Sequence, residues 1–170
     1  MTYTRTQISL HWITAILILV MLGTGLAYSY DLADSGAIAT HQIAGQVLIV
    51  VLVARMLAKF RNRRAVRQTA HARWERMTAH SVHIGLYLCL IAFVVTGYVA
   101  ASALRDPMLV FPADLAFARS ETGEAFLDTH FLMKWVLLGL LAAHFAGSIK
   151  HHFIDRDDTL SNMTFSTRKD

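Results

Sequence analysis

The sequence predicts an all-α protein, a transmembrane four-helix bundle. Hydrophobic residues make up 55% of the 170 residues and charged residues only 16%, whereas a soluble domain carries about 25% charged residues. The apolar residues fall into four runs, at residues 8–28, 41–60, 80–103 and 130–149, and none of the four contains Asp or Glu. Because about 20 apolar residues cross a bilayer as one helix, we expect four spans in a single domain over residues 1–170.

Lysine and arginine residues gather on one side of the predicted membrane. They lie at both chain ends and around the segment between the second and third spans: Arg5, Arg55, Lys59, Arg61, Arg63, Arg64, Arg67, Arg73, Arg76, Lys150, Arg156, Arg168 and Lys169. The other side has only Arg105, Arg119 and Lys134, among several acidic residues. Because basic loops stay in the cytoplasm, we expect a bacterial inner-membrane protein with both termini cytoplasmic. The net charge of +4 is then explained by topology and contact with lipid headgroups, and we expect no nucleic-acid binding.

The single cysteine, Cys89, lies inside the third apolar run. One thiol cannot form an intramolecular disulfide, and it excludes thiolate iron–sulfur clusters and structural zinc sites. We therefore expect Cys89 to be a buried apolar residue. The polar residues after Asp155 are expected to be poorly ordered, as chain ends often are.

Histidines are unusually frequent for so apolar a chain, with nine in all, and ionisable residues inside membrane spans are usually functional. His130 and His144 share one face of the fourth span, at levels about 21 Å apart. His11 lies near the cytoplasmic end of the first span, and His41 begins the second span on the opposite side. Depth alone therefore pairs His11 with His144 and His41 with His130.

Two histidine pairs at two levels of a bundle suit the axial positions of two haem irons. No Cys-x-x-Cys-His sequence for covalent attachment is present, so the haems would be b-type. His80 and His83 begin the third span, and either could replace His11 as the partner of His144. Three nearby glycines could make room for a macrocycle or for close helix packing: Gly45, Gly139 and Gly147.

Other polar residues near the pairs have two interpretations each. Arg55, Lys59 and Lys134 could neutralise haem propionates, or could extend to lipid headgroups. His151 lies two turns beyond His144 on nearly the same face. It could bond a propionate or a quinone carbonyl, or it could be an interfacial histidine. His152 has no predicted role.

The histidines belong to a longer pattern: Gln7-Ile8-Ser9-Leu10-His11-Trp12, His41, His130, His144, His151-His152 and Asp158-Thr159-Leu160. This pattern, which spans nearly the whole chain, resembles the bacterial cytochrome b561 family, and in particular its small stand-alone dihaem superoxide:ubiquinone oxidoreductases. The resemblance implies two haem b groups, one held by His11 and His144 and the other by His41 and His130. It also implies electron transfer from periplasmic superoxide to ubiquinone, with His151 near the quinone. One departure is Thr129, where relatives often have tryptophan.

Two histidine ligands per iron leave no open position, so the expected chemistry is electron transfer rather than oxygen activation. The main expectation is a superoxide:quinone oxidoreductase with no catalytic residues beyond the haem ligands, which could form a homodimer. One alternative is a haem-bearing membrane anchor of a larger quinone-linked dehydrogenase, with residues 104–129 as a docking surface. Another is a haem-free, histidine-dependent transporter.

Overall fold

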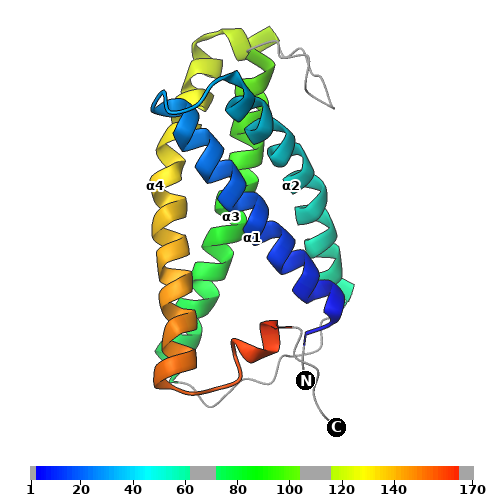
Figure 1. Cartoon of the computed structure of the whole chain (residues 1–170), viewed down its shortest axis with the longest axis vertical. Coiled ribbons are helices and arrows are strands. Elements are labelled where there is room, and N and C mark those ends of the chain that lie inside the picture. The colour runs from blue at the N-terminus through cyan, green and yellow to red at the C-terminus, as the bar shows by residue number, and fades with distance from the viewer. Residues whose placement is uncertain (1–2, 62–71, 104–115, 165–170) are drawn as a thin grey trace.

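Four long helices make up most of the computed structural model, which describes residues 3–61, 72–103 and 116–164. They are α1 (Arg5–Ser29), α2 (Ser35–Arg61), α3 (Arg73–Ala103) and α4 (Glu121–Ile149). The helices run alternately up and down the long axis of the molecule (Figure 1). Because the described residues contain no strand, the predicted all-α class is confirmed.

All four helices are long and apolar enough to cross a membrane. Large apolar side chains cover their outer faces, and several are about two-thirds exposed, among them Leu19, Val50, Leu88 and Leu132. Such faces are stable against lipid tails. A helix also satisfies its backbone hydrogen bonds within the segment, as the bilayer interior requires. The chain is therefore a multi-pass membrane protein.

The start of α1 and the short helix η3, the first and last described helical segments, lie at the same end of the bundle (Figure 1). We call this the basal end; it holds the start of α1, the end of α2, the start of α3 and the end of α4. The apical end holds the α1–α2 connection and the start of α4. These two names define levels in the bundle without reference to the sides of a membrane.

The helices extend beyond the predicted spans, most clearly in α4, which begins at Glu121 instead of near residue 130. The added turns of α4 contain Glu121, Glu124 and Asp128, so a run without acidic residues could not include them. Glu121 and Glu124 in the first turn stabilise the positive end of the helix dipole. A short helix, η1 (Ala116–Arg119), precedes α4, and the carbonyl of its Ala118 packs so closely on Gly123 that a side chain there would not fit.

The bundle consists of two helical hairpins, because α1 packs mainly on α2 and α3 mainly on α4, whereas α2 and α3 touch less. The hairpins meet in an apolar core formed by buried residues of all four helices: Ile18, Leu48, Leu52, Cys89, Leu90 and Leu137. The thiol of Cys89 is free and buried, as the sequence predicts.

Beyond α4 the chain is ordered further than expected. A wide π-helical turn, η2 (Lys150–Ile154), leads into a segment that folds back beneath α1 and contains a short helix, η3 (Ser161–Met163) (Figure 1). The indole nitrogen of Trp12 donates a hydrogen bond of 2.8 Å to the carbonyl of Met163. The prediction of a poorly ordered segment after Asp155 is therefore wrong for residues up to 164, because α1 supplies an anchor that is remote in sequence.

Candidate functional site

Two pairs of imidazole rings face each other across the two hairpins, one pair at each level. At the apical level, the rings of His41 on α2 and His130 on α4 have centres 6.1 Å apart, with their planes inclined by 79°. At the basal level, the rings of His11 on α1 and His144 on α4 have centres 6.2 Å apart, inclined by 52°. These are the pairs that depth along the spans predicts.

The ring spacing matches that of two ligands on opposite faces of one metal ion. An imidazole nitrogen binds a first-row metal at about 2 Å. The radius of each ring adds roughly 1 Å, so two imidazoles on either side of an iron would have centres about 6 Å apart. The two observed spacings, 6.1 and 6.2 Å, agree with this value. The donor set, neutral imidazoles in an apolar bundle, is also the kind that haem iron accepts.

Hydrogen bonds orient both rings of the apical pair. The Nδ1 atom of His41 lies 2.9 Å from the carbonyl oxygen of Met21, to which Nδ1–H donates. The hydroxyl of Thr96 donates to the carbonyl of Ala92, so the Thr96 oxygen can accept the Nδ1–H of His130 at 3.0 Å. Each arrangement assigns the proton to Nδ1 and the lone pair to Nε2. Partners of this kind orient metal-binding histidines.

Two glycines make room for the apical rings. A Cβ atom on Gly25 of α1 would lie 2.9 Å from Nδ1 of His41, and one on Gly97 of α3 would lie 3.0 Å from Cε1 of His130. Each histidine thus packs on a glycine of the neighbouring helix in its own hairpin. The sequence indicates different glycines, but side chains at Gly139 and Gly147 would meet nothing within 4 Å.

Positive charge surrounds the basal pair. The guanidinium of Arg55 lies 2.9 Å from Nδ1 of His11, and Arg55 and Lys59 both lie over the ring of Tyr87, at 5.3 and 4.8 Å. Burial, with a smaller effect of Tyr87, raises the pKa of nearby Tyr3. The sequence indicated Arg55 and Lys59 but neither tyrosine, because only the fold brings the chain start against α2 and α3.

The bond between Arg55 and His11 constrains how a metal could bind. A guanidinium only donates, so Nδ1 of His11 accepts in this arrangement and its proton lies on Nε2. Coordination through Nε2 would move that proton to Nδ1. Arg55 would then need another acceptor, such as a carboxylate of the bound group.

His83 also contacts His144, but in a different way. Their ring centres are 5.1 Å apart and their planes are perpendicular, which is too close for an intervening iron. The Nδ1 atom of His83 lies 2.6 Å from the carbonyl of Ala79, and His80 is exposed. Between the candidate partners of His144, only His11 has the spacing of an axial pair.

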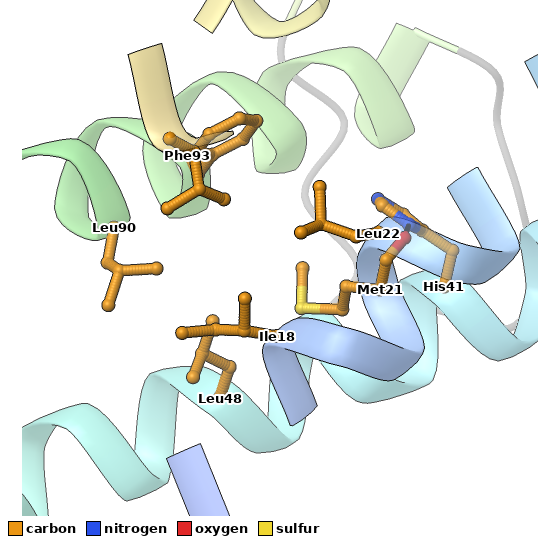
Figure 2. Close-up of a pocket in the computed structure, with 8 residues that line it drawn as sticks. Ile18, Met21, Leu22, His41, Leu48, Leu90 and Phe93 are labelled. Carbon is orange, nitrogen blue, oxygen red and sulfur yellow. Dashed lines mark hydrogen bonds between the residues drawn. The ribbon is translucent and has the colours of Figure 1, made fainter. Parts of the chain in front are cut away.

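An apolar cavity of about 40 Å³ lies beside the apical pair. Figure 2 shows His41 at its edge, with Ile18, Met21 and Leu22 from α1, Leu48 from α2, and Leu90 and Phe93 from α3. A ligand pocket usually measures at least about 300 Å³. A macrocycle between the rings would therefore require Met21, Leu22 and Phe93 to adopt other rotamers; the Phe93 ring is 4.9 Å from that of His130.

Comparison with known proteins shows which family this chain belongs to. The sequence model of the family described as prokaryotic cytochrome b561 matches residues 2–166. The chain belongs to this family. Cytochrome b561 homolog 2 of Escherichia coli (strain K12) is 32% identical in an alignment 170 residues long, which covers 94% of this chain and 89% of the relative. Cytochrome b561 homolog 1 of the same organism is 26% identical, with 95% and 96% covered.

Cytochromes b561 are membrane electron-transfer proteins that bind b-type haem. Membership therefore confirms the predicted family, the helical haem-binding bundle and the general class of function. Among the described residues of this cytochrome b561, the two imidazole pairs have a ring spacing that fits two ligands of one iron.

The other cation predicted near the pairs, Lys134, lies in aromatic surroundings. Its ammonium is 5.7 Å from the ring centre of Tyr30 and 5.5 Å from that of Trp135. Further residues indicated by the sequence lie outside the described part of this cytochrome b561: Arg63, Arg64, Arg67, Arg105, Arg168 and Lys169.

A second polar cluster of this cytochrome b561 lies at the basal end, where His151 and two carboxylates converge. The Nδ1 atom of His151 is 3.0 Å from Oδ2 of Asp157 and also 3.0 Å from Oδ2 of Asp155. The ammonium of Lys150 bridges Asp155, at 2.7 Å, and Glu75 of α3, at 2.8 Å. The sequence indicated His151 but none of these acidic residues. Asp157 lies in the segment that was expected to be poorly ordered, and Glu75 reaches the cluster only through the packing of α3 beside the end of α4.

A cavity of about 100 Å³ adjoins this cluster, between the start of α3 and the end of α4. It is lined by Trp74, Glu75, Ala79, Gly147, Lys150 and His151. An indole, an imidazole and an ion pair therefore line one cavity, which is smaller than a usual ligand pocket.

Proposed function

We propose that this cytochrome b561 binds two b-type haems, one between His11 and His144 and one between His41 and His130. The observation that carries the proposal is the matched spacing of both ring pairs, 6.2 and 6.1 Å. Haem held in this way would supply one-electron transfer without an open iron position.

The chain's own residues would prepare the two sites differently. At the apical site, Met21 and Thr96 orient the imidazoles, and Gly25 and Gly97 leave space for them. At the basal site, Arg55 and Lys59 supply positive charge that can neutralise propionates. The cationic site would favour the reduced state of a bound redox group.

We infer that the basal end faces the cytoplasm. Most described basic residues lie at this end: Arg5, Arg55, Lys59, Arg61, Arg73, Arg76, Lys150 and Arg156. The apical end has acidic residues at the α1–α2 connection and in the first turns of α4. The rule that cytoplasmic loops are basic supports this orientation in a bacterial inner membrane.

We further propose that the protein oxidises superoxide at the apical side and reduces ubiquinone at the basal side. Two superoxide ions would each give up one electron to form dioxygen, and one quinone would take up both electrons and two protons to form quinol. The resemblance to dihaem superoxide:ubiquinone oxidoreductases supports the two substrates. The cavity beside His151 supports a quinone headgroup at the basal end.

Haem binding is tested by a reduced-minus-oxidised absorption spectrum and a haem count per purified chain. We expect two low-spin b haems in the native protein and one in each of the variants His41→Ala and His11→Ala. His80→Ala, a change at an exposed histidine, is the matched control and should retain two. A colourless native protein would contradict the proposal and favour a histidine-dependent transporter.

The substrates are tested in proteoliposomes that contain ubiquinone, with superoxide generated enzymatically outside. Quinol should form in the native protein and not in His41→Ala. If superoxide drives no quinol formation, and a stoichiometric protein partner copurifies in mild detergent, the chain is instead the membrane subunit of a larger quinone-linked dehydrogenase.

A further inference from the structure

We propose that His151, positioned by Asp157, is the proton donor to the quinone at the basal end. This inference rests on the quinone reduction proposed above. It assigns a chemical role to a histidine–carboxylate pair that electron transfer alone does not need.

The backbone at this point brings the two side chains together. In η2 the backbone N–H of Asp155 bonds to the carbonyl of Lys150, five residues earlier, so the turn is wider than in an α-helix. Such turns are frequent at functional sites. The chain then turns back, and the N–H of Asp157 bonds to the carbonyl of His151. His151 and Asp157 are thereby tied through both their backbones and their side chains.

Asp157 is held as a carboxylate by its surroundings. Its Oδ1 atom accepts a 2.7 Å hydrogen bond from the backbone N–H of Thr159. Burial alone would raise the pKa of Asp157, but the bonds from Thr159 and the contact with His151 outweigh burial and lower it below the ordinary value of 3.8. Its Oδ2 atom faces Nδ1 of His151 at 3.0 Å.

The other charges around His151 leave Asp157 as its principal acceptor. Asp155 also approaches Nδ1, but both of its oxygens bind Lys150, at 2.9 and 2.7 Å. Lys150 is shared with Glu75 of α3. The side chains of His151 and Asp157 are only 17% and 11% exposed, so their contact is little screened by solvent.

This arrangement assigns different tasks to the two ring nitrogens. The Nδ1–H donates to Asp157, and Nε2 lies on the other edge of a ring that lines the cavity. In the reaction, the Nε2–H bond of the doubly protonated ring breaks and an O–H bond forms on the quinone oxygen that has gained an electron. The ring is left neutral, with its proton on Nδ1. Solvent at the basal end then restores the Nε2 proton for the second transfer.

The test separates proton delivery from electron transfer. Haem-loaded protein in lipid nanodiscs is first reduced stoichiometrically in the absence of oxygen. The rate of its oxidation is then measured after mixing with a short-chain ubiquinone or with ferricyanide. Ferricyanide accepts electrons without taking up protons. Because a general acid contributes about 100-fold or more, His151→Gln should slow oxidation by quinone about 100-fold and leave oxidation by ferricyanide unchanged. His152→Gln, the adjacent exposed histidine, should behave like the native protein.

Asp157 is tested as a positioning residue. Asp157→Asn should slow oxidation by quinone about tenfold, as expected when an orienting partner is lost, and should change its pH profile. Asp157→Glu should restore much of the rate. Haem content and ferricyanide oxidation show in each case that the variant is folded.

One outcome would contradict only the role of His151, and a different outcome would contradict the proposed reduction of quinone. If His151→Gln reacts with quinone at the native rate and with the native pH profile, His151 is not the proton donor, although quinone is still the acceptor. If the native protein is oxidised by ferricyanide but not by quinone, the proposed function itself fails, and the role of His151 fails with it.

Discussion

The ring of His41 packs directly on Gly25, so that a Cβ atom on residue 25 would lie only 2.9 Å from Nδ1 of the histidine. The same nitrogen is bonded to the carbonyl of Met21, one turn earlier on α1. The α1 backbone therefore determines both the position and the tautomer of an imidazole that belongs to α2.

Gly25→Ala is expected to displace this ring and weaken haem binding at the apical site. The added methyl group must push His41 away from the Met21 carbonyl, and losing such an orienting partner costs about tenfold or more in affinity. The measurement is the haem ratio per chain after purification. Gly23→Ala is the matched control, because a Cβ at Gly23 meets nothing within 4 Å; equal haem loss in both variants would refute the explanation.

Thr96→Val is expected to affect the other apical histidine through a different property. Valine has nearly the shape of threonine but cannot accept the Nδ1–H of His130. A less strongly donating imidazole should raise the midpoint potential of the apical haem and weaken its retention about tenfold. Thr96→Ser keeps the hydroxyl and should keep the native potential in a spectroelectrochemical titration.

Arg55→Gln should lower the midpoint potential of the basal haem. The guanidinium beside His11 favours the state that carries an additional electron, so its removal favours the oxidised state. We expect a decrease of roughly 60 mV, which is a tenfold change in a one-electron equilibrium. Arg61→Gln, at the exposed end of α2, should have little effect. An equal decrease in both variants would point to general surface charge.

The pairing of histidines by level could be predicted from the sequence, because depth along a span follows from counting residues. The choice between His11 and His83 could not, since helical periodicity gives the face of a helix but not its rotation relative to a neighbour. Only the structure places His83 edge-on to His144 at 5.1 Å. The same limitation explains why Gly25 and Gly97 were missed: each makes room for a side chain of another helix.

The basal cluster was beyond sequence reasoning for another reason. Hydropathy predicts where a helix leaves the membrane, and a polar segment after that point is predicted to be disordered. Here the wide turn of η2 and the bond between Trp12 and Met163 order the segment. Asp155 and Asp157 thus reach His151 through contacts that no local pattern contains.

Acidification should release the segment beyond α4. Because the pKa of Asp157 is lower in the folded protein than its ordinary value of 3.8, its contribution to docking is fully present above pH 3.8 and is lost as the pH falls further. In a Trp74→Phe, Trp135→Phe background, Trp12 emission should stay constant down to about pH 4 and shift to the red below it. Asp157→Asn, which has no carboxylate to protonate at this position, should lose the change in emission between about pH 5 and pH 3; a transition that persists unchanged would contradict the link.

The division of the bundle into two hairpins has a consequence for how the protein matures. Each imidazole pair takes one ring from α1–α2 and one from α4, so on the proposed ligation neither hairpin can retain haem alone. Bound haem would then link the α1–α2 hairpin to the α3–α4 hairpin, which enter the membrane one after the other. The supply of haem would then determine the fate of newly inserted chains. With haem the two hairpins would stay associated, and without it they could separate and be degraded by membrane proteases.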